Sequence, residues 1–115
     1  MANTFKVITK AGVTSADVIY TVAGSTTTVI LGLIIGNTTS SSITTTVTLG
    51  TDTSNRSGAN NEDNQAVELL TATPIPGNST LELLAGNKVV METTDTLSLT
   101  GSAATDIILS VMEIT

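Results

Sequence analysis

Carboxylates are the residues of this 115-residue chain best placed to do chemistry, because it contains no histidine, cysteine or tryptophan. Three pairs could in principle share the acid and base roles of glycoside hydrolysis: Glu62 with Asp63, Glu92 with Asp95, and Asp106 with Glu113. A sugar-cleaving groove normally offers aromatic platforms, however, and the chain has one phenylalanine and one tyrosine. A serine or threonine nucleophile would need a lysine as its base, and nothing around the lysines favours that role. The sequence therefore predicts no enzyme and no cofactor.

The segment Asp52–Asn64 carries hard oxygen ligands of the kind that calcium prefers. An EF-hand loop counted from Asp52 would need glycine at its sixth position and glutamate at its twelfth, where this chain has Ser57 and Asp63. The pattern fails, so no metal site is predicted, although a looser calcium site in this segment stays open.

The net charge and the length of the apolar runs argue against two classes of partner, nucleic acids and membranes. The net charge is −6 and the isoelectric point is near 4.1, whereas nucleic-acid binding needs a basic face. The longest apolar run, Val29–Ile35, falls far short of the roughly 20 residues that span a bilayer. Residues 1–10 lack the apolar core of a secretory signal. We therefore expect no nucleic-acid or membrane partner, and synthesis in the cytoplasm.

A period of two dominates the chain and predicts strands. In Ile43–Leu49, apolar residues and threonines alternate, as in a strand with one buried and one wet face. No segment has helical spacing with caps. Nine strands are predicted: Phe5–Thr9, Val18–Val22, Thr26–Ile35, Ile43–Leu49, Ala66–Thr73, Thr80–Ala85, Lys88–Glu92, Thr96–Thr100 and Asp106–Glu113. The prediction is one all-β domain over residues 1–115, an antiparallel β-sandwich or jelly-roll-like domain of about eight or nine short strands.

Two segments, Val29–Ile35 and Ile107–Met112, are apolar on both alternating faces. Such strands lie at the centre of a sheet, and their second face is covered either by loops or by another subunit. Both alternatives stay open here. We expect a homo-oligomer, with four candidate subunit contacts: Ile30, Ile34, Ile108 and Met112.

Turn residues divide the second half of the chain. Gly86-Asn87 predicts a hairpin between Leu81–Leu84 and Val89–Met91, and Thr93-Thr94-Asp95 predicts the next reversal. The two prolines in Thr73–Gly77 exclude a central strand there, since proline cannot donate to a ladder, and predict a corner or an edge crossing.

Several stretches resemble a known group of proteins. They are Val29–Thr38, Pro74–Leu84, Gly86–Glu92, Asp95–Leu97 and Asp106–Ile114. Together they are similar to small virion proteins of tailed bacteriophages, particularly those of marine and cyanobacterial hosts. The resemblance implies a β-sandwich or jelly-roll unit that is built in many copies into a particle.

The function implied is that of a capsid decoration (cement) protein, which binds the major capsid protein or other virion proteins and stabilises the head. The alternatives are a tail or neck component and, in another class, a carbohydrate-binding module for host recognition. We expect the protein at the capsid surface or on the tail. Two segments are candidates for touching the lattice, residues 1–16 as a contact arm and the loop Gly50–Gln65; the alternatives are a solvated N-terminus and a plain surface loop. The candidate lattice contacts are Phe5, Lys6, Lys10, Asp52, Arg56, Glu62 and Asp63.

Overall fold

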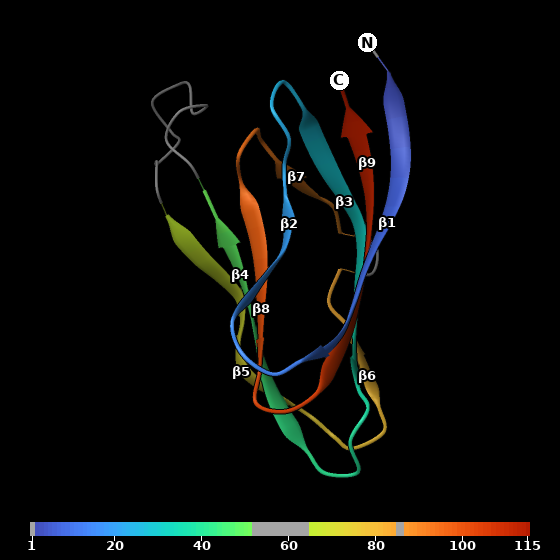
Figure 1. The fold of residues 1–115 in the computed structure, drawn as a ribbon, viewed down its shortest axis with the longest axis vertical. Helices are drawn as coiled ribbons and strands as arrows, with labels where there is room; N and C mark the ends of the chain where they lie inside the picture. The colour runs from blue at the N-terminus through green and yellow to red at the C-terminus, as the bar shows by residue number, and fades with distance from the viewer. Residues whose placement is uncertain (1, 52–64, 85–86) are drawn as a thin grey trace.

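The structure, a computed structural model, describes residues 2–51, 65–84 and 87–115. These residues form two antiparallel sheets packed face to face (Figure 1). Sheet A contains β1 (Asn3–Val13), β3 (Thr27–Asn37), β6 (Thr80–Glu82), β7 (Val89–Met91) and β9 (Thr105–Ile114). Sheet B contains β2 (Asp17–Thr21), β4 (Ile43–Gly50), β5 (Ala66–Ile75) and β8 (Thr96–Gly101). The predicted all-β sandwich is confirmed.

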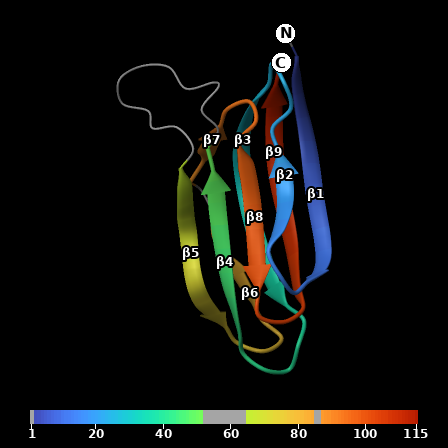
Figure 2. The same cartoon turned by 60° about the vertical axis from the view of Figure 1, so that its left-hand side comes forward.

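The strands pair in a nested order. β1 pairs with β9, β2 with β8, β3 with β6 and β7, and β4 with β5, so the chain is one long hairpin rolled into two sheets. The sheet orders that result, β1-β9-β3-β6 and β2-β8-β4-β5, are those of a jelly roll. The turned view in Figure 2 shows the two layers and the chain ends beside each other.

The nine predicted strands all occur, with end points that differ by a few residues. The predicted hairpin between Leu81–Leu84 and Val89–Met91 is wrong. Both segments pair with β3 instead, β6 near Ile35 and β7 near Val29, so they lie end to end along the same neighbour. They are two pieces of one broken edge strand.

The predicted corner around the prolines is confirmed. Pro74 lies near the end of β5, which is the outer strand of sheet B. The buried Asn37 side chain donates to the carbonyl oxygens of Ile75 and Pro76 and accepts from the backbone nitrogen of Thr39. The amide thus joins the end of β3 to this corner by bonding backbone carbonyl groups at the point where β5 ends.

Close packing fixes the residue that follows the prolines. A Cβ on Gly77 would clash with the Ser40 carbonyl oxygen, so no other residue fits without a backbone shift. Asn78 then takes a positive φ of 57° as the chain turns into β6. The reversal at Thr93-Thr94-Asp95 is also confirmed, since Thr94 has a φ of 71°.

Aliphatic side chains fill the space between the sheets. Sheet A contributes Leu33, Leu109 and Val111, and sheet B contributes Leu97 and Leu99, all at most 1% exposed. Burying a side chain of this size stabilises a fold by about 1.5–3 kcal/mol. Aliphatic side chains therefore supply the hydrophobic stabilisation of the core, and few aromatic residues are needed for it.

The N-terminal segment belongs to the sandwich. Eight consecutive residues of β1, from Asn3 to Lys10, pair with β9, so most of residues 1–16 form a sheet strand and not a separate arm. Contact between this segment and another protein stays a prediction. No membrane-spanning helix is present in residues 2–51, 65–84 or 87–115.

Candidate interaction surface

The outer face of sheet A carries rows of apolar side chains that run across strands. One row crosses four strands, from Phe5 through Met112 and Val29 to Val90, each residue pairing with the next. Directly paired residues in antiparallel strands share a face. Since Leu109 and Val111 point into the core, their neighbour Met112 and its whole row face outward.

A second outward row contains Thr9, Ile108 and Ile34. Between the two rows, Val7 pairs with Ser110. Phe5 and Val7 are 71% and 65% exposed, and Ile108 is 44% exposed. Seven large hydrophobic residues are exposed in the described part of the chain, and five of them lie on this face: Phe5, Val7, Ile34, Val90 and Ile108. The apolar surface is therefore concentrated on one side of the molecule.

Charges are confined to one end of this face. Within the described strands of sheet A, the charged residues at outward positions are Glu82, opposite Ile34, and Asp106, opposite Gly36. Asp106 lies near the end of β9 that is remote from the paired chain termini, and Glu82 belongs to β6, whose label stands at the same end of the sandwich in Figure 1. The row from Phe5 to Val90 therefore contains no charged residue, whereas the row of Thr9, Ile108 and Ile34 ends at Glu82. A contact made through the first row avoids the repulsion that a protein of net charge −6 would otherwise bring to an acidic partner.

The outer face of sheet B has a different chemistry. Thr46 pairs with Thr100 and Thr48 with Ser98, and all four point away from the buried Leu97 and Leu99. Threonine suits a strand because it is branched at Cβ, and its hydroxyl remains hydrated. Sheet B is therefore built to face water.

Of the four predicted subunit contacts, Ile34, Ile108 and Met112 lie on the outer face of sheet A, but Ile30 does not. Ile30 is fully buried in the core. The register of β3 against β9 shifts between Ile30 and Gly32, and one extra residue turns every later side chain to the opposite face. Ile30 therefore cannot contact another subunit from this position.

Sequence reasoning missed Val7 and Val90, which the fold adds to the apolar rows. The alternation Phe5, Val7, Thr9 was a usable signal, because two of its three members are apolar. Phe5, which was predicted as a lattice contact, lies in the same rows.

The other predicted lattice contacts have different outcomes. The Lys6 Nζ lies 2.8 Å from Glu113 Oε1, and the Lys10 Nζ lies 3.0 Å from Asp17 Oδ2, so both lysines form ion pairs within the chain. Four more candidates fall outside the described residues: Asp52, Arg56, Glu62 and Asp63. The calcium alternative in Asp52–Asn64 falls outside them too.

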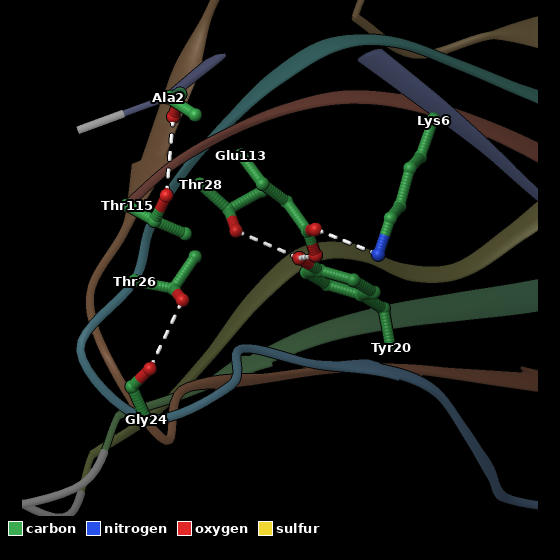
Figure 3. A network of polar contacts seen from close by, with 8 residues as sticks. All are labelled: Ala2, Lys6, Tyr20, Gly24, Thr26, Thr28, Glu113 and Thr115. Carbon is green, nitrogen blue, oxygen red and sulfur yellow. Dashed lines mark hydrogen bonds and ion pairs between the residues drawn. The ribbon is translucent and has the colours of Figure 1, made fainter. Parts of the chain in front are cut away.

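A polar network joins the two sheets beside the chain termini (Figure 3). The Tyr20 hydroxyl of β2 lies 2.5 Å from Glu113 Oε2 on β9 and 2.7 Å from Thr28 Oγ1 on β3. A phenol has one proton, and the carboxylate can only accept it, so Thr28 donates to the Tyr20 oxygen. Lys6 completes the network through its ion pair with Glu113.

The network moves the pKa values of Tyr20 and Glu113 away from neutral pH. Burial, together with the hydrogen bond to Glu113, raises the pKa of Tyr20 to about 12. The hydrogen bonds from Lys6 and then from Tyr20 lower the pKa of Glu113 below its ordinary value. Neither group is therefore poised to exchange a proton near neutral pH, which general acid–base catalysis requires. Because the network of Lys6, Tyr20, Thr28 and Glu113 lies between the two sheets, a structural role is favoured for it.

The described residues contain no group of three or more His, Cys, Asp or Glu side chains that could hold a metal ion. Two of the carboxylate pairs considered for glycoside chemistry have both members described, Glu92 with Asp95 and Asp106 with Glu113. Asp95 Oδ2 accepts from the Glu92 backbone nitrogen at 3.0 Å. Asp106 accepts from the Gly12 backbone nitrogen at 2.9 Å, while Glu113 belongs to the Tyr20 network seven residues further along β9. These two carboxylates serve separate local contacts.

Comparison with known proteins gives few matches. No family model matches the chain, and no curated protein matches it. A solved structure of a Bacillus endospore appendage, from work describing these appendages as a novel family of disulfide-linked pili, is similar with a TM-score of 0.49. The two share 14% sequence identity over 99% of this chain and 87% of the other. This chain has no cysteine with which to form such links.

Proposed function

We propose that this chain is a structural subunit that assembles with copies of itself and with other proteins through the outer face of sheet A. The observation that carries the proposal is the gathering of five exposed large hydrophobic residues on that face. Contiguous apolar patches on water-facing surfaces mark interaction sites. The strands do not need these residues in order to form, since the two central strands of sheet B, β4 and β8, carry threonine and serine at the equivalent positions.

The face is large enough for a specific contact. Four neighbouring strands span about 19 Å, and ten residues of a strand about 33 Å, which gives roughly 600 Å². A standard interface takes about 800 Å² from each partner. The face of sheet A therefore supplies most of such an interface, and flanking turns can supply the rest.

We further propose that the assembly is a virion and that the chain is a capsid decoration protein. The proposal starts from the resemblance of stretches such as Val29–Thr38 and Asp106–Ile114 to small virion proteins of tailed phages. The jelly-roll topology is compatible with it, since jelly rolls are common in viral capsids, although lectins and cupins also use them. In this arrangement, sheet A packs on the capsid protein or on neighbouring copies, and sheet B faces water. Each bound copy adds buried area across capsomer seams, so that neighbours become harder to separate under internal pressure.

The test is to mix the purified protein with expanded empty heads of the phage that carries its gene, and to measure bound copies by mass photometry. Saturable binding in hundreds of copies is the expected result. Rings of a dozen or fewer copies that ignore the heads would indicate a tail or neck component. Binding to host polysaccharide without particle association would indicate a recognition module. A protein that stays monomeric and binds none of these would overturn the proposal.

A matched pair of variants locates the contact. Ile108→Lys places a charge on the second strand of sheet A, and Thr100→Lys places the same charge on the second strand of sheet B, both pointing outward. Ile108→Lys is expected to abolish binding because the charge would have to be buried without a partner. Thr100→Lys is expected to bind as the unmodified protein does. Equal behaviour of the two variants would contradict the choice of face.

A further inference from the structure

The four outer edges of the two sheets are not equally protected against pairing with another strand. An exposed edge offers unpaired N–H and C=O groups, and native proteins blunt it with short strands, prolines or bulges. β2 has five residues and a register shift. β5 contains Pro74, register shifts and Ala72 at a φ of 44°. The edge of sheet A opposite β1 is broken into β6 and β7, with three residues each.

β1 has none of these protections over most of its length. From Asn3 to Lys10 it pairs with β9 without interruption, and the bulge at Gly12 comes only after this run. Lysines on an edge normally discourage pairing. Here, however, Lys6 and Lys10 are drawn back into ion pairs with Glu113 and Asp17. The edge is therefore long, regular and partly neutralised.

The pairing pattern shows which backbone groups are free on this edge. Ala2 and Thr115 exchange both of their hydrogen bonds, with N···O distances of 3.2 and 2.9 Å. In an antiparallel ladder such pairs alternate with pairs that exchange none. Even-numbered residues of β1 therefore bond to β9, and Phe5, Val7 and Thr9 direct their N–H and C=O groups away from it.

We propose that β1 pairs antiparallel with β1 of a second copy about a twofold axis at Val7. This inference rests on the proposed self-assembling function and adds a second contact between copies, at the β1 edge, to the contact through the outer face. The pairing joins two copies of sheet A into one continuous sheet. The apolar row of Phe5, Met112, Val29 and Val90 ends at the β1 edge, so the partner copy extends the apolar face instead of covering it.

Like charges exclude two of the possible registers, and the length of the overlap decides between the others. An axis at Lys6 would set Lys6 opposite its own copy, and an axis at Ile8 would set Lys6 opposite Lys10, and like charges directly opposite destabilise a sheet. An axis at Phe5 overlaps only Asn3–Val7. The axis at Val7 overlaps residues 3–11, with Phe5 opposite Thr9 and Lys6 opposite Ile8.

The experiment measures hydrogen exchange of the backbone amides by NMR. It is carried out at protein concentrations below and above the concentration at which the chain self-associates. The amides of Phe5, Val7 and Thr9 are expected to exchange freely in the monomer and to be protected in the assembly. An assembly in which these three amides still exchange freely would overturn the inference. That result would leave the proposed function intact, because assembly itself would have been observed. A protein that never assembles would instead overturn the proposed function.

A variant pair gives a second measurement. Val7→Pro removes an N–H that makes no bond to β9, so the sandwich can tolerate it as edge strands tolerate proline. Two hydrogen bonds are lost at the axis, one from each copy, and the dimer should weaken by at least about tenfold. Val7→Thr keeps the N–H and the β-branched shape and should weaken it much less. Equal dissociation constants for the two variants would count against strand pairing. If Val7→Pro does not fold, the exchange experiment on the unmodified chain decides.

A crosslink tests the register. The chain has no cysteine, so Val7→Cys introduces a single thiol at the axis, where the paired Cα atoms lie about 5.5 Å apart, within disulfide range. Val18→Cys, at a valine that is 51% exposed on the edge strand β2, is the control. Covalent dimers are expected for Val7→Cys alone. Equal crosslinking at both sites would contradict the register.

Discussion

The two outer faces of the jelly roll differ although their inner faces are alike. The second strand of sheet A, β9, turns Leu109 and Val111 inward, and the second strand of sheet B, β8, turns Leu97 and Leu99 inward. Outward, β9 presents Ile108 and Met112, whereas β8 presents Ser98 and Thr100. The inward set forms the core and the outward set decides what the surface contacts. Fold stability and interaction are therefore encoded in alternate residues of the same strands.

Adjacent substitutions on β9 give the largest expected difference between the two sets. Leu109→Ala, in the core, should lower the free energy of unfolding by about 2–5 kcal/mol. Ile108→Ala, its outward neighbour, should lower it by less than about 1 kcal/mol while weakening self-association. Chemical denaturation and sedimentation measure the two effects. If Ile108→Ala destabilised the fold as strongly as Leu109→Ala, the claim that inward residues determine stability and outward residues determine association would be wrong.

Converting one face into the other is the next test. The double variant Thr48→Ile, Ser98→Ile places a paired apolar patch on sheet B, since these two residues face each other outward. Stability should change little, because isoleucine is at least as good a strand former as threonine and serine. New concentration-dependent association should appear in sedimentation velocity, as exposed apolar patches drive contact. No added association would show that apolarity alone does not make an assembly face.

A smaller effect is expected from the network between the sheets. Tyr20→Phe leaves the buried Thr28 hydroxyl without its acceptor and should cost about 1–2 kcal/mol in thermal or chemical unfolding. Association through the outer face should not change. If association fell in proportion to stability, the faces would not act independently of the interior.

The pH dependence of stability follows from the same groups. The pKa of Glu113 is lowered from 4.5, so its contribution is complete above pH 4.5 and is lost as the pH falls below that value. The pKa of Tyr20 is raised from 10.0 to about 12, so its contribution is complete below pH 10 and is lost as the pH rises through 12. Tyr20→Phe should therefore remove the alkaline loss, and unfolding curves at pH 7, 10 and 12 measure it.

The strands were predictable from the sequence, because alternation such as that in Ile43–Leu49 is a local signal. The outward apolar set was only partly predictable. Ile30 and Ile34 share a parity in sequence, but the register shift between Ile30 and Gly32 places them on opposite faces. Gly32 inside an apolar run was the available sign of such a bulge.

Long-range contacts were beyond local reasoning. Tyr20 and Glu113 are 93 residues apart, and nothing near either residue indicates the other. The broken edge strand was misjudged for the same reason. The residues around Gly86-Asn87 carry a genuine turn signal, but β6 and β7 each find their partner in β3, which precedes them by about fifty residues. The turn residues Gly86-Asn87 indicated a change of chain direction, but they could not indicate that the strands on either side pair with β3.

The bonds between Ala2 and Thr115 place both chain ends at one end of the sandwich, on antiparallel neighbours. A force that pulls these ends apart acts across the sheet, along the hydrogen bonds between β1 and β9, and so opens them one pair at a time. A load carried through the face of sheet A must instead separate a whole surface at once. Mechanically, the molecule is weak when held by its ends and strong when held by its side.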